Sequence, residues 1–302
     1  MCASEEKRPV LHVVTGPTAS GKTALALELA CALGAEIVSC DSSAVYRGMD
    51  IGTAKPSAAQ RALVPHHCLD IAEPDAPFSV CDYIAAARAA IAGILARGRA
   101  VVIAGGSGFY LKAFYRAVVD DIPVPPEVAG RVRQLAMQGP AALEAALLPF
   151  APDRPAFLDW ENPRRLAKAL ERCLASGLPL VKIRERFLGA PGAFDDFAKR
   201  TLLLAPTPET HPARIEARVH AMLDAGLVDE VRNLSAAGKL PEGMPAAAAT
   251  GYRETLQWLR DGQPGGTPAL AAAISLSTRQ LAAKQRKWFR TQIPVDEIRP
   301  VP

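Results

Sequence analysis

The chain has 302 residues, of which 49% are hydrophobic and 22% charged, and this composition excludes collagen-like, disordered and disulfide-stapled proteins. Its length exceeds the roughly 100–200 residues of one domain, so more than one unit is expected. The net charge of +4 is too small to indicate a polyanionic partner. Yet five of the 35 basic side chains, and no acidic one, lie between Thr278 and Arg290, and without them 30 bases would face 31 acids. The positive surplus therefore lies in one short segment.

The N-terminal residues are polar, and no apolar run approaches the roughly 18–20 residues that span a bilayer. We therefore expect no signal peptide and no membrane partner. Six cysteines are scattered without a Cys-x-x-Cys pair, a pattern typical of reduced thiols. These features predict a cytoplasmic protein, with a monomer as the default expectation.

Short β-branched runs alternate with Ala- and Leu-rich helical patterns over the first hundred residues. Helices are expected to end near Leu33 and to cover Val80–Arg97. This alternation predicts a parallel sheet with helices on its faces. The expected strands are Leu11–Thr15, Glu36–Ser39, Cys68–Ile71, Ala100–Ala104 and, later in the chain, Leu202–Ala205.

Residues 122–200 have a different pattern, because prolines open this stretch and helical periodicity follows without a strand. We expect an all-helical domain at 122–200, inserted into an α/β core made of 1–121 and 201–302. Its expected helices are Pro126–Met137, Ala141–Leu148, Pro163–Ser176 and Leu180–Phe187. After the last strand the chain is predicted to be helical at 211–225, 227–237, 246–260 and 267–290.

One motif identifies the class of the core. Residues 16–23 read Gly-Pro-Thr-Ala-Ser-Gly-Lys-Thr and fit G-x-x-x-x-G-K-[ST], between a predicted strand and a predicted helix. In such a loop the backbone N–H groups and the helix N-terminus hold phosphate oxygens, Lys22 neutralises them and Thr23 offers a hydroxyl to Mg²⁺. The fold is therefore predicted to be a P-loop NTPase-like parallel sheet. The candidate phosphate-binding residues are Gly16, Pro17, Thr18, Ala19, Ser20, Gly21, Lys22 and Thr23.

Two further strand ends carry polar groups. Asp41 follows the second predicted strand, where it could take a proton from an acceptor near the phosphate, or simply cap the next helix. Gly105-Gly106-Ser107-Gly108 follows the fourth predicted strand and forms a second turn with exposed N–H groups and a hydroxyl. Both turns lie where ligands bind in a doubly wound sheet.

These residues resemble the bacterial tRNA dimethylallyltransferases, also called tRNA isopentenyltransferases, of the IPP transferase family. The phosphate loop, the segment from Asp41 to Pro56, Pro65-His66-His67, Gly105–Tyr110 and Gly251-Tyr252-Arg253-Glu254 carry the resemblance in order. The segment from Thr278 to Arg290 closes the series, so the likeness runs from about residue 10 to 290. The sequence departs from the family pattern at Ala44 and at Ala248-Ala249.

The resemblance implies transfer of a dimethylallyl group from dimethylallyl diphosphate to N6 of the adenosine 3′ of the anticodon, at tRNA position 37, with Mg²⁺. It makes Asp41 the general base and Lys22 and Ser107 further catalytic groups, with Arg214 and Arg218 as added contacts to the diphosphate. The partners would be dimethylallyl diphosphate and the anticodon stem-loop of tRNA. The implied tRNA contacts are Asp41, Ser42, Ser43, Ala44, Ser107, Arg131, Arg164, Arg165, Leu166, Ala167, Lys168, Gly251, Tyr252, Arg253, Lys284 and Arg286.

Other functions remain open at this point. A small-molecule kinase, an adenylate isopentenyltransferase acting on free nucleotides, and an RNA-binding protein with a structural P-loop would share the motif. Arg164, Arg165, Lys168 and Arg172 form a basic stripe on one predicted helix, which could follow a phosphate backbone or be ordinary solvated surface.

Overall fold

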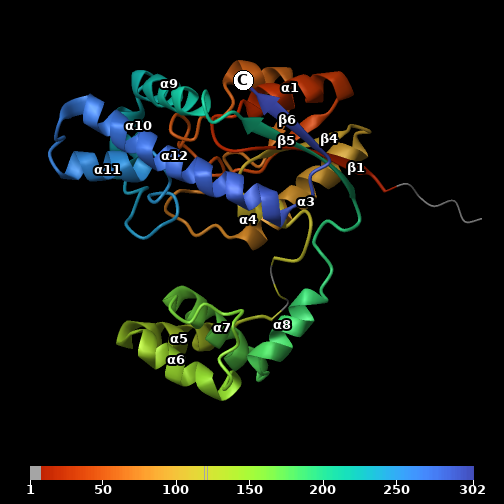
Figure 1. Ribbon diagram of the computed structural model, residues 1–302, viewed down its shortest axis with the longest axis vertical. Helices are drawn as coiled ribbons and strands as arrows, with labels where there is room; N and C mark the ends of the chain where they lie inside the picture. Colours follow the sequence, from red (N-terminus) through yellow and green to blue (C-terminus); the bar gives the residue numbers. More distant parts are fainter. Residues whose placement is uncertain (1–7, 119, 121) are drawn as a thin grey trace, which may run out of the picture. The chain divides into compact units, whose positions relative to one another are not determined.

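The computed structural model describes residues 8–118, 120 and 122–302 and divides the chain into two compact units (Figure 1). The core unit comprises the chain up to Arg116 together with Ala193–Pro302, and the helical unit comprises Ala117–Gly192. The insertion expected at 122–200 begins and ends several residues later than this helical unit. Phe194 belongs to the core unit because its ring stacks on Phe114 with centroids 4.3 Å apart.

The core unit contains a parallel sheet whose strand order, in the described part of the chain, is β3-β2-β4-β1-β5-β6. The predicted parallel α/β fold is confirmed. β1, β4 and β2 are short and buried, and they pair in register from Leu11 with Val101 and from Glu36 with Val101. The strands are β1 Val10–Thr15, β2 Glu36–Ser39, β3 His66–His67, β4 Val101–Gly105, β5 Ala198–Pro206 and β6 Glu297–Val301.

The sequence placed some elements wrongly. Cys68–Ile71 is not a strand, because Cys68 and Asp70 have φ angles of 60° and 56°, which no strand allows. β3 lies just before it. The helix expected at 246–260 begins only at Tyr252, after Gly251 adopts φ 94° and its N–H donates to the Glu254 carboxylate at 2.7 Å. β6 was not predicted.

Helices surround the sheet of the core unit. α1 packs on β1, β2 and β4 through Ala26 and Ala30, which lie against Val14, Ile37 and Val102. Within the described residues, no helix combines the length and apolarity needed to cross a bilayer. The core helices are α1 Lys22–Leu33, α2 Ala58–Leu63, α3 Val80–Ala96, α4 Gly108–Lys112, α9 His211–Asp224, α10 Leu227–Ala236, α11 Tyr252–Arg260 and α12 Gly266–Gln292.

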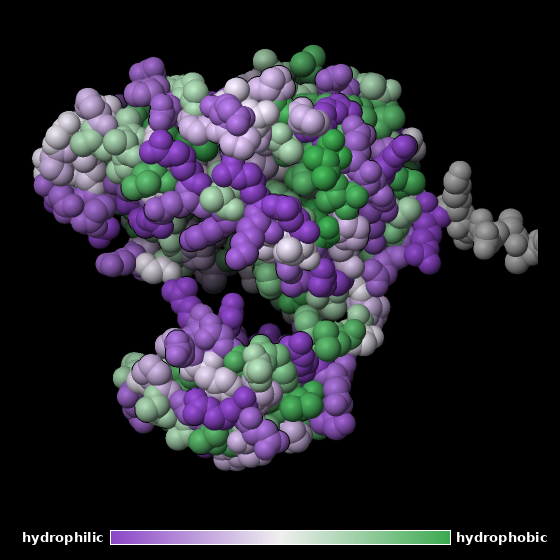
Figure 2. All heavy atoms as spheres, in the orientation of Figure 1, coloured by the Kyte–Doolittle hydropathy of each residue, from purple (hydrophilic) through white to green (hydrophobic). Residues whose placement is uncertain are grey.

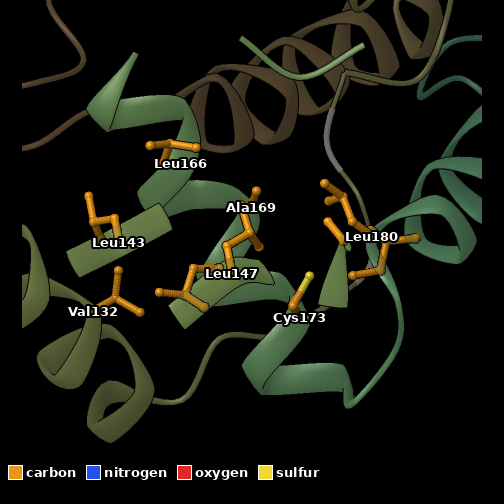
Figure 3. Packing of buried hydrophobic residues seen from close by; sticks show 10 residues of the cluster. Val132, Leu143, Leu147, Leu166, Ala169, Cys173 and Leu180 are labelled. Carbon is orange, nitrogen blue, oxygen red and sulfur yellow. The ribbon is translucent and has the colours of Figure 1, made fainter. Parts of the chain in front are cut away.

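The helical unit has its own apolar core (Figure 3). α7 crosses this core and contributes Leu166, Ala169, Leu170 and Cys173, each at most 7% exposed. Asn162 begins α7 by accepting hydrogen bonds from the N–H groups of Arg164 and Arg165. The helices of this unit are α5 Pro126–Gln138, α6 Pro140–Leu147, the short 3₁₀ turn η1 Leu148–Phe150, α7 Pro163–Ser176 and α8 Leu180–Leu188.

Candidate active site

The site lies at the carboxyl edge of three neighbouring strands. Because β2, β4 and β1 are adjacent and parallel, the segments that follow them meet at one edge of the sheet. These segments are Asp41–Ala44, the Gly106 turn (Gly105–Gly108) and the phosphate loop (Gly16–Thr23). The ends of β2 and β4 approach so closely that a Cβ on Gly105 would lie 2.0 Å from the Cys40 carbonyl oxygen. Only glycine permits this approach.

The phosphate loop turns back on itself after β1. Ala19 and Gly21 have φ angles of 59° and 88°, and α1 begins directly after Gly21. The Lys22 ammonium donates to the Pro17 carbonyl oxygen at 2.7 Å, which folds the side chain over the loop. The Ser20 hydroxyl is buried, and within the described residues it has no hydrogen-bond partner. A buried hydroxyl without a partner indicates a place for a polar ligand.

Lys22 is electrostatically unusual. Its pKa is lowered to about 7, chiefly by burial and also by the neighbouring Arg218, while Asp41 acts in the opposite direction. Burial also lowers the pKa of Arg218, again opposed by Asp41. Two cations and one carboxylate therefore face one small volume, so the site carries surplus positive charge that an anionic ligand would neutralise.

Asp41 organises the turn after β2. Its Oδ1 accepts from the N–H groups of Ser43 at 2.9 Å and Ala44 at 3.3 Å. No hydrogen bond from the described residues reaches Oδ2. Asp41 therefore caps a turn and not the next helix, because residues 42–45 form turns and α2 begins only at Ala58. Its second oxygen remains able to accept a proton.

Ser107 links the Gly106 turn to the Asp41 turn. Its Oγ accepts from the Ser42 N–H at 2.8 Å and lies 3.0 Å from the Ser42 Oγ. Its own N–H donates to the Cys40 carbonyl oxygen at 3.2 Å. The structure thus brings together Lys22, Asp41 and Ser107, the three side chains that the resemblance makes catalytic.

These segments enclose a cavity of about 600 Å³ in the core unit. Besides the three strand-end segments, its walls include the loop from Gly52 to Pro56, Arg218 and Thr250-Gly251. Thr23 and Asp41 both line it. The Thr23 hydroxyl is a hard oxygen donor of the kind that Mg²⁺ prefers, so Thr23 fits a magnesium ion accompanying a diphosphate.

The two candidate arginines of α9 take different places. Arg218 lines the cavity and donates to the Thr53 carbonyl oxygen at 3.4 Å. Arg214 lies outside it, where its guanidinium donates to the carbonyl oxygens of Ala19 at 3.2 Å and Pro302 at 3.1 Å. Arg214 thus supports the back of the phosphate loop.

The predicted tRNA-contact residues of the core unit occupy three kinds of position: the cavity wall, the buried core and the surface. Ser42, Ser43, Ala44 and Gly251 line the cavity. Tyr252 does not fit its predicted role as a contact, because its side chain is fully buried and its hydroxyl donates to Glu230 at 2.5 Å. The remaining candidates lie on the surface: Arg253 beside Glu254, Lys284 exposed, and Arg286 against His211. Hydrophilic side chains gather over α12 in Figure 2.

In the helical unit the basic side chains are exposed and mostly paired. Arg165 contacts Asp159 at 3.2 Å and Lys168 contacts Glu171 at 2.7 Å, while Arg131 and Arg164 have no ion-pair partner among the described residues. Ala167 is half-buried. The prediction that Leu166 contacts tRNA is wrong for its side chain, which is 0% exposed in the core of this unit. Helical spacing brings it to the inner face.

Two residues of the site were not predicted. The Lys55 ammonium, on a side chain only 1% exposed, donates to Asp50 at 2.8 Å and to Asp70 at 2.5 Å. Glu230 of α10 accepts from the N–H groups of Asp50, Ile51 and Gly52 at 2.9, 2.8 and 3.2 Å. Together they fix the loop that forms one wall of the cavity. Lys55 lies in the segment from Asp41 to Pro56 that carries the family resemblance, whereas Glu230 follows Asp229 on a helical pattern and is not distinguished by the sequence.

The strand, glycine-rich loop and helix, with Lys22 facing the cavity, define a P-loop α/β protein built to hold a phosphorylated ligand. The model of the IPP transferase family matches residues 44–292, and the chain belongs to this family.

Relatives and solved structures extend the match over nearly the whole chain. The tRNA dimethylallyltransferase of Opitutus terrae is 49% identical over 97% of this chain and 94% of the relative, and that of Methylibium petroleiphilum is 44% identical over 92% and 85%. The tRNA isopentenylpyrophosphate transferase of Bacillus halodurans is 31% identical with a TM-score of 0.69, covering 97% and 90%. A eukaryotic dimethylallyltransferase acting on tRNA, 22% identical over 97% of this chain and 74% of the neighbour, with a TM-score of 0.81, shares the fold.

Proposed function

We propose that this chain transfers a dimethylallyl group from dimethylallyl diphosphate to N6 of the adenosine at tRNA position 37 and releases diphosphate. The observation that supports it most directly is the meeting of Asp41, Lys22 and Ser107 at one cavity. Relatives that match nearly the whole chain are named for the same reaction. These names do not favour the kinase and free-nucleotide alternatives.

The phosphate loop holds the leaving group in this proposal. Apart from the N–H groups of Thr18 and Ser20, which donate to Gln285 and Pro17, the N–H groups of the loop and the start of α1 face the diphosphate. Lys22 and Arg218 balance the negative charge that grows as the carbon–oxygen bond breaks. The Ser20 hydroxyl gains a phosphate oxygen as partner. Thr23 is the residue that would hold Mg²⁺, which would supply further positive charge to the departing diphosphate.

Asp41 takes the proton of the acceptor. As the N6–carbon bond forms, the allylic carbon–oxygen bond breaks and its electron pair leaves with the diphosphate. Asp41 Oδ2 accepts the proton that N6 loses, while Oδ1 stays bound to the Ser43 and Ala44 N–H groups. Ser107 keeps this turn in place through Ser42. The exposed basic side chains of both units, including Arg131, Arg164, Lys168, Arg253 and Lys284, are the proposed contacts to the tRNA backbone.

The test is nucleoside analysis of tRNA after incubation with the protein, dimethylallyl diphosphate and Mg²⁺. We expect one prenylated adenosine next to the anticodon, and none on AMP supplied without tRNA. Asp41→Asn preserves the oxygen that caps the turn and removes the base, so turnover should fall by roughly 10²–10⁴ with diphosphate binding retained. Asp224→Asn, on the exposed end of α9, is the matched control. Near-normal turnover in Asp41→Asn would refute its role, and unmodified tRNA would refute the function.

A further inference from the structure

One side chain of α12 connects two separate turns of the site. The Gln285 Oε1 accepts a hydrogen bond from the Thr18 N–H at 2.8 Å. The Gln285 Nε2 donates to the Gly106 carbonyl oxygen at 2.9 Å. A single amide therefore bridges the phosphate loop and the Gly106 turn, and Gln285 also lines the cavity.

The partners leave no freedom in how this amide is oriented. A backbone N–H can only donate and a carbonyl oxygen can only accept, so the oxygen of Gln285 must face Thr18 and its nitrogen must face Gly106. A glutamate could not donate to Gly106, and a lysine could not accept from Thr18. An asparagine is one methylene shorter. Glutamine is the residue whose length and polarity meet both requirements.

The peptide group that follows Thr18 is held as well. The Thr18 carbonyl oxygen lies 2.8 Å from the buried His211 Nε2, and this nitrogen must carry the proton because the carbonyl only accepts. The His211 Nδ1 is then an acceptor, and Arg286 donates to it at 2.8 Å. Burial lowers the pKa of His211, as expected for a neutral ring in this place. Consecutive residues of α12 thus hold the two peptide groups on either side of Thr18, Gln285 directly and Arg286 through His211.

The Gly106 turn packs closely against the phosphate loop and against α12. A Cβ on Gly106 would lie 3.0 Å from the Gly16 carbonyl oxygen and 3.1 Å from the Gln285 Nε2. A Cβ on Gly108 would lie 2.9 Å from the Trp288 ring, one turn further along α12. α12 therefore meets the Gly106 turn at two points, and the turn cannot shift without moving Gln285.

We infer that Gln285 is a positioning residue that fixes the spacing between the leaving-group side of the site, formed by the phosphate loop, and the acceptor side, formed by Ser107 and Asp41. This inference rests on the proposed function and goes beyond it by assigning a role to α12. Ser107 transmits the position of the Gly106 turn to the Asp41 turn through its bond with Ser42. Since a misplacement of about 1 Å can cost roughly 10² in rate, loosening this bridge affects the chemical step more than ligand binding.

The test compares Gln285→Met, which keeps the length and removes both hydrogen bonds, with Gln280→Met, an exposed position on the same helix. All measurements are made at a temperature at which circular dichroism shows every variant folded. We expect Gln285→Met to exchange amide hydrogens faster in both turns, to bind inorganic pyrophosphate within about threefold of the unaltered protein, and to lose at least tenfold in kcat with KM changed less than threefold. Gln285→Glu should keep Thr18 protected while the Gly106 turn exchanges faster.

Equal exchange and equal kcat in Gln285→Met and Gln280→Met would overturn the inference. A loss of pyrophosphate affinity as large as the loss of kcat would also overturn it, because Gln285 would then serve binding rather than positioning. If the unaltered protein leaves tRNA unmodified, the proposed function fails by itself. The exchange and pyrophosphate measurements still decide the role of Gln285 in that case.

Discussion

The pKa of Lys22 makes the binding of a diphosphate depend on pH. The free protein holds this pKa near 7, chiefly through burial. A bound anion raises it, so binding takes up a proton whenever Lys22 is neutral beforehand. The affinity is therefore highest below pH 7 and weakens as the pH rises through the window between the pKa of the free protein and the higher pKa of the complex.

The size of the effect follows from the protonated fraction of Lys22, which falls about tenfold for each pH unit above its pKa. Between pH 7.5 and 9.5 the affinity should fall roughly 75-fold, equivalent to about 2.6 kcal/mol. Burial lowers the pKa of His211 and raises that of the Cys40 thiol, so both move away from this pH range. Burial also lowers the pKa of Arg218, and the Lys22→Arg control separates its contribution from that of Lys22. An alkyl diphosphate is a suitable ligand, because the last ionisation of a phosphate monoester, near about 6, is complete by pH 7.5.

The assay is titration calorimetry with an unreactive alkyl diphosphate, without magnesium, at several pH values. Lys22→Arg is the control, since a guanidinium stays protonated and should give a flat profile. A change of less than about threefold over the two units in the unaltered protein would show that the Lys22 ammonium does not balance the ligand's charge. An equal slope in Lys22→Arg would assign the effect to another group.

Two further predictions concern stability. Glu230→Gln replaces an acceptor oxygen facing Asp50 and Ile51 with an NH₂ group, so the free energy of unfolding should fall by roughly 1–3 kcal/mol. The control Glu242→Gln, on the surface, should change it by less than about 0.5 kcal/mol. Denaturant titration measures both variants, and equal unfolding midpoints would contradict the role assigned to Glu230. Leu166→Ala should lower the stability of the helical unit by about 2–5 kcal/mol and leave the affinity for pyrophosphate unchanged. The control is Leu188→Ala, at an exposed position. Hydrogen exchange over residues 117–192 measures the effect, and exchange that is no faster in Leu166→Ala would contradict the prediction.

The sequence predicted the parallel core because its signals are local. The eight-residue loop carries its own strand, turn and helix chemistry, and the buried strands Val10–Thr15 and Val101–Gly105 are short apolar runs. β6 was missed because it reads Glu-Ile-Arg-Pro-Val, with charges and a proline that are tolerated only at the sheet edge where it lies. Alanines favour helix at residues 246–250, but the Gly251 cap delays α11 to Tyr252.

In the candidate site, too, the residues with local sequence signals were predicted and the others were not. Lys22, Asp41 and Ser107 follow strands, so sheet topology alone predicts that they meet. Tyr252 and Leu166 were misjudged because the motif marks them as important without distinguishing a contact from a buried support. Gln285 was not a candidate, since nothing local to α12 indicates that its amide reaches residues 267 and 179 positions earlier.

The wide separation of Thr18 and Gln285 along the chain has a consequence for biosynthesis. At about 5–20 residues per second, the ribosome adds Gln285 roughly 13–53 s after Thr18. During that interval a nascent chain displays the complete phosphate-loop motif without the helix that holds its Thr18 peptide in place. A premature stop anywhere before α12 would therefore yield a product that a motif search recognises but that lacks the finished active site.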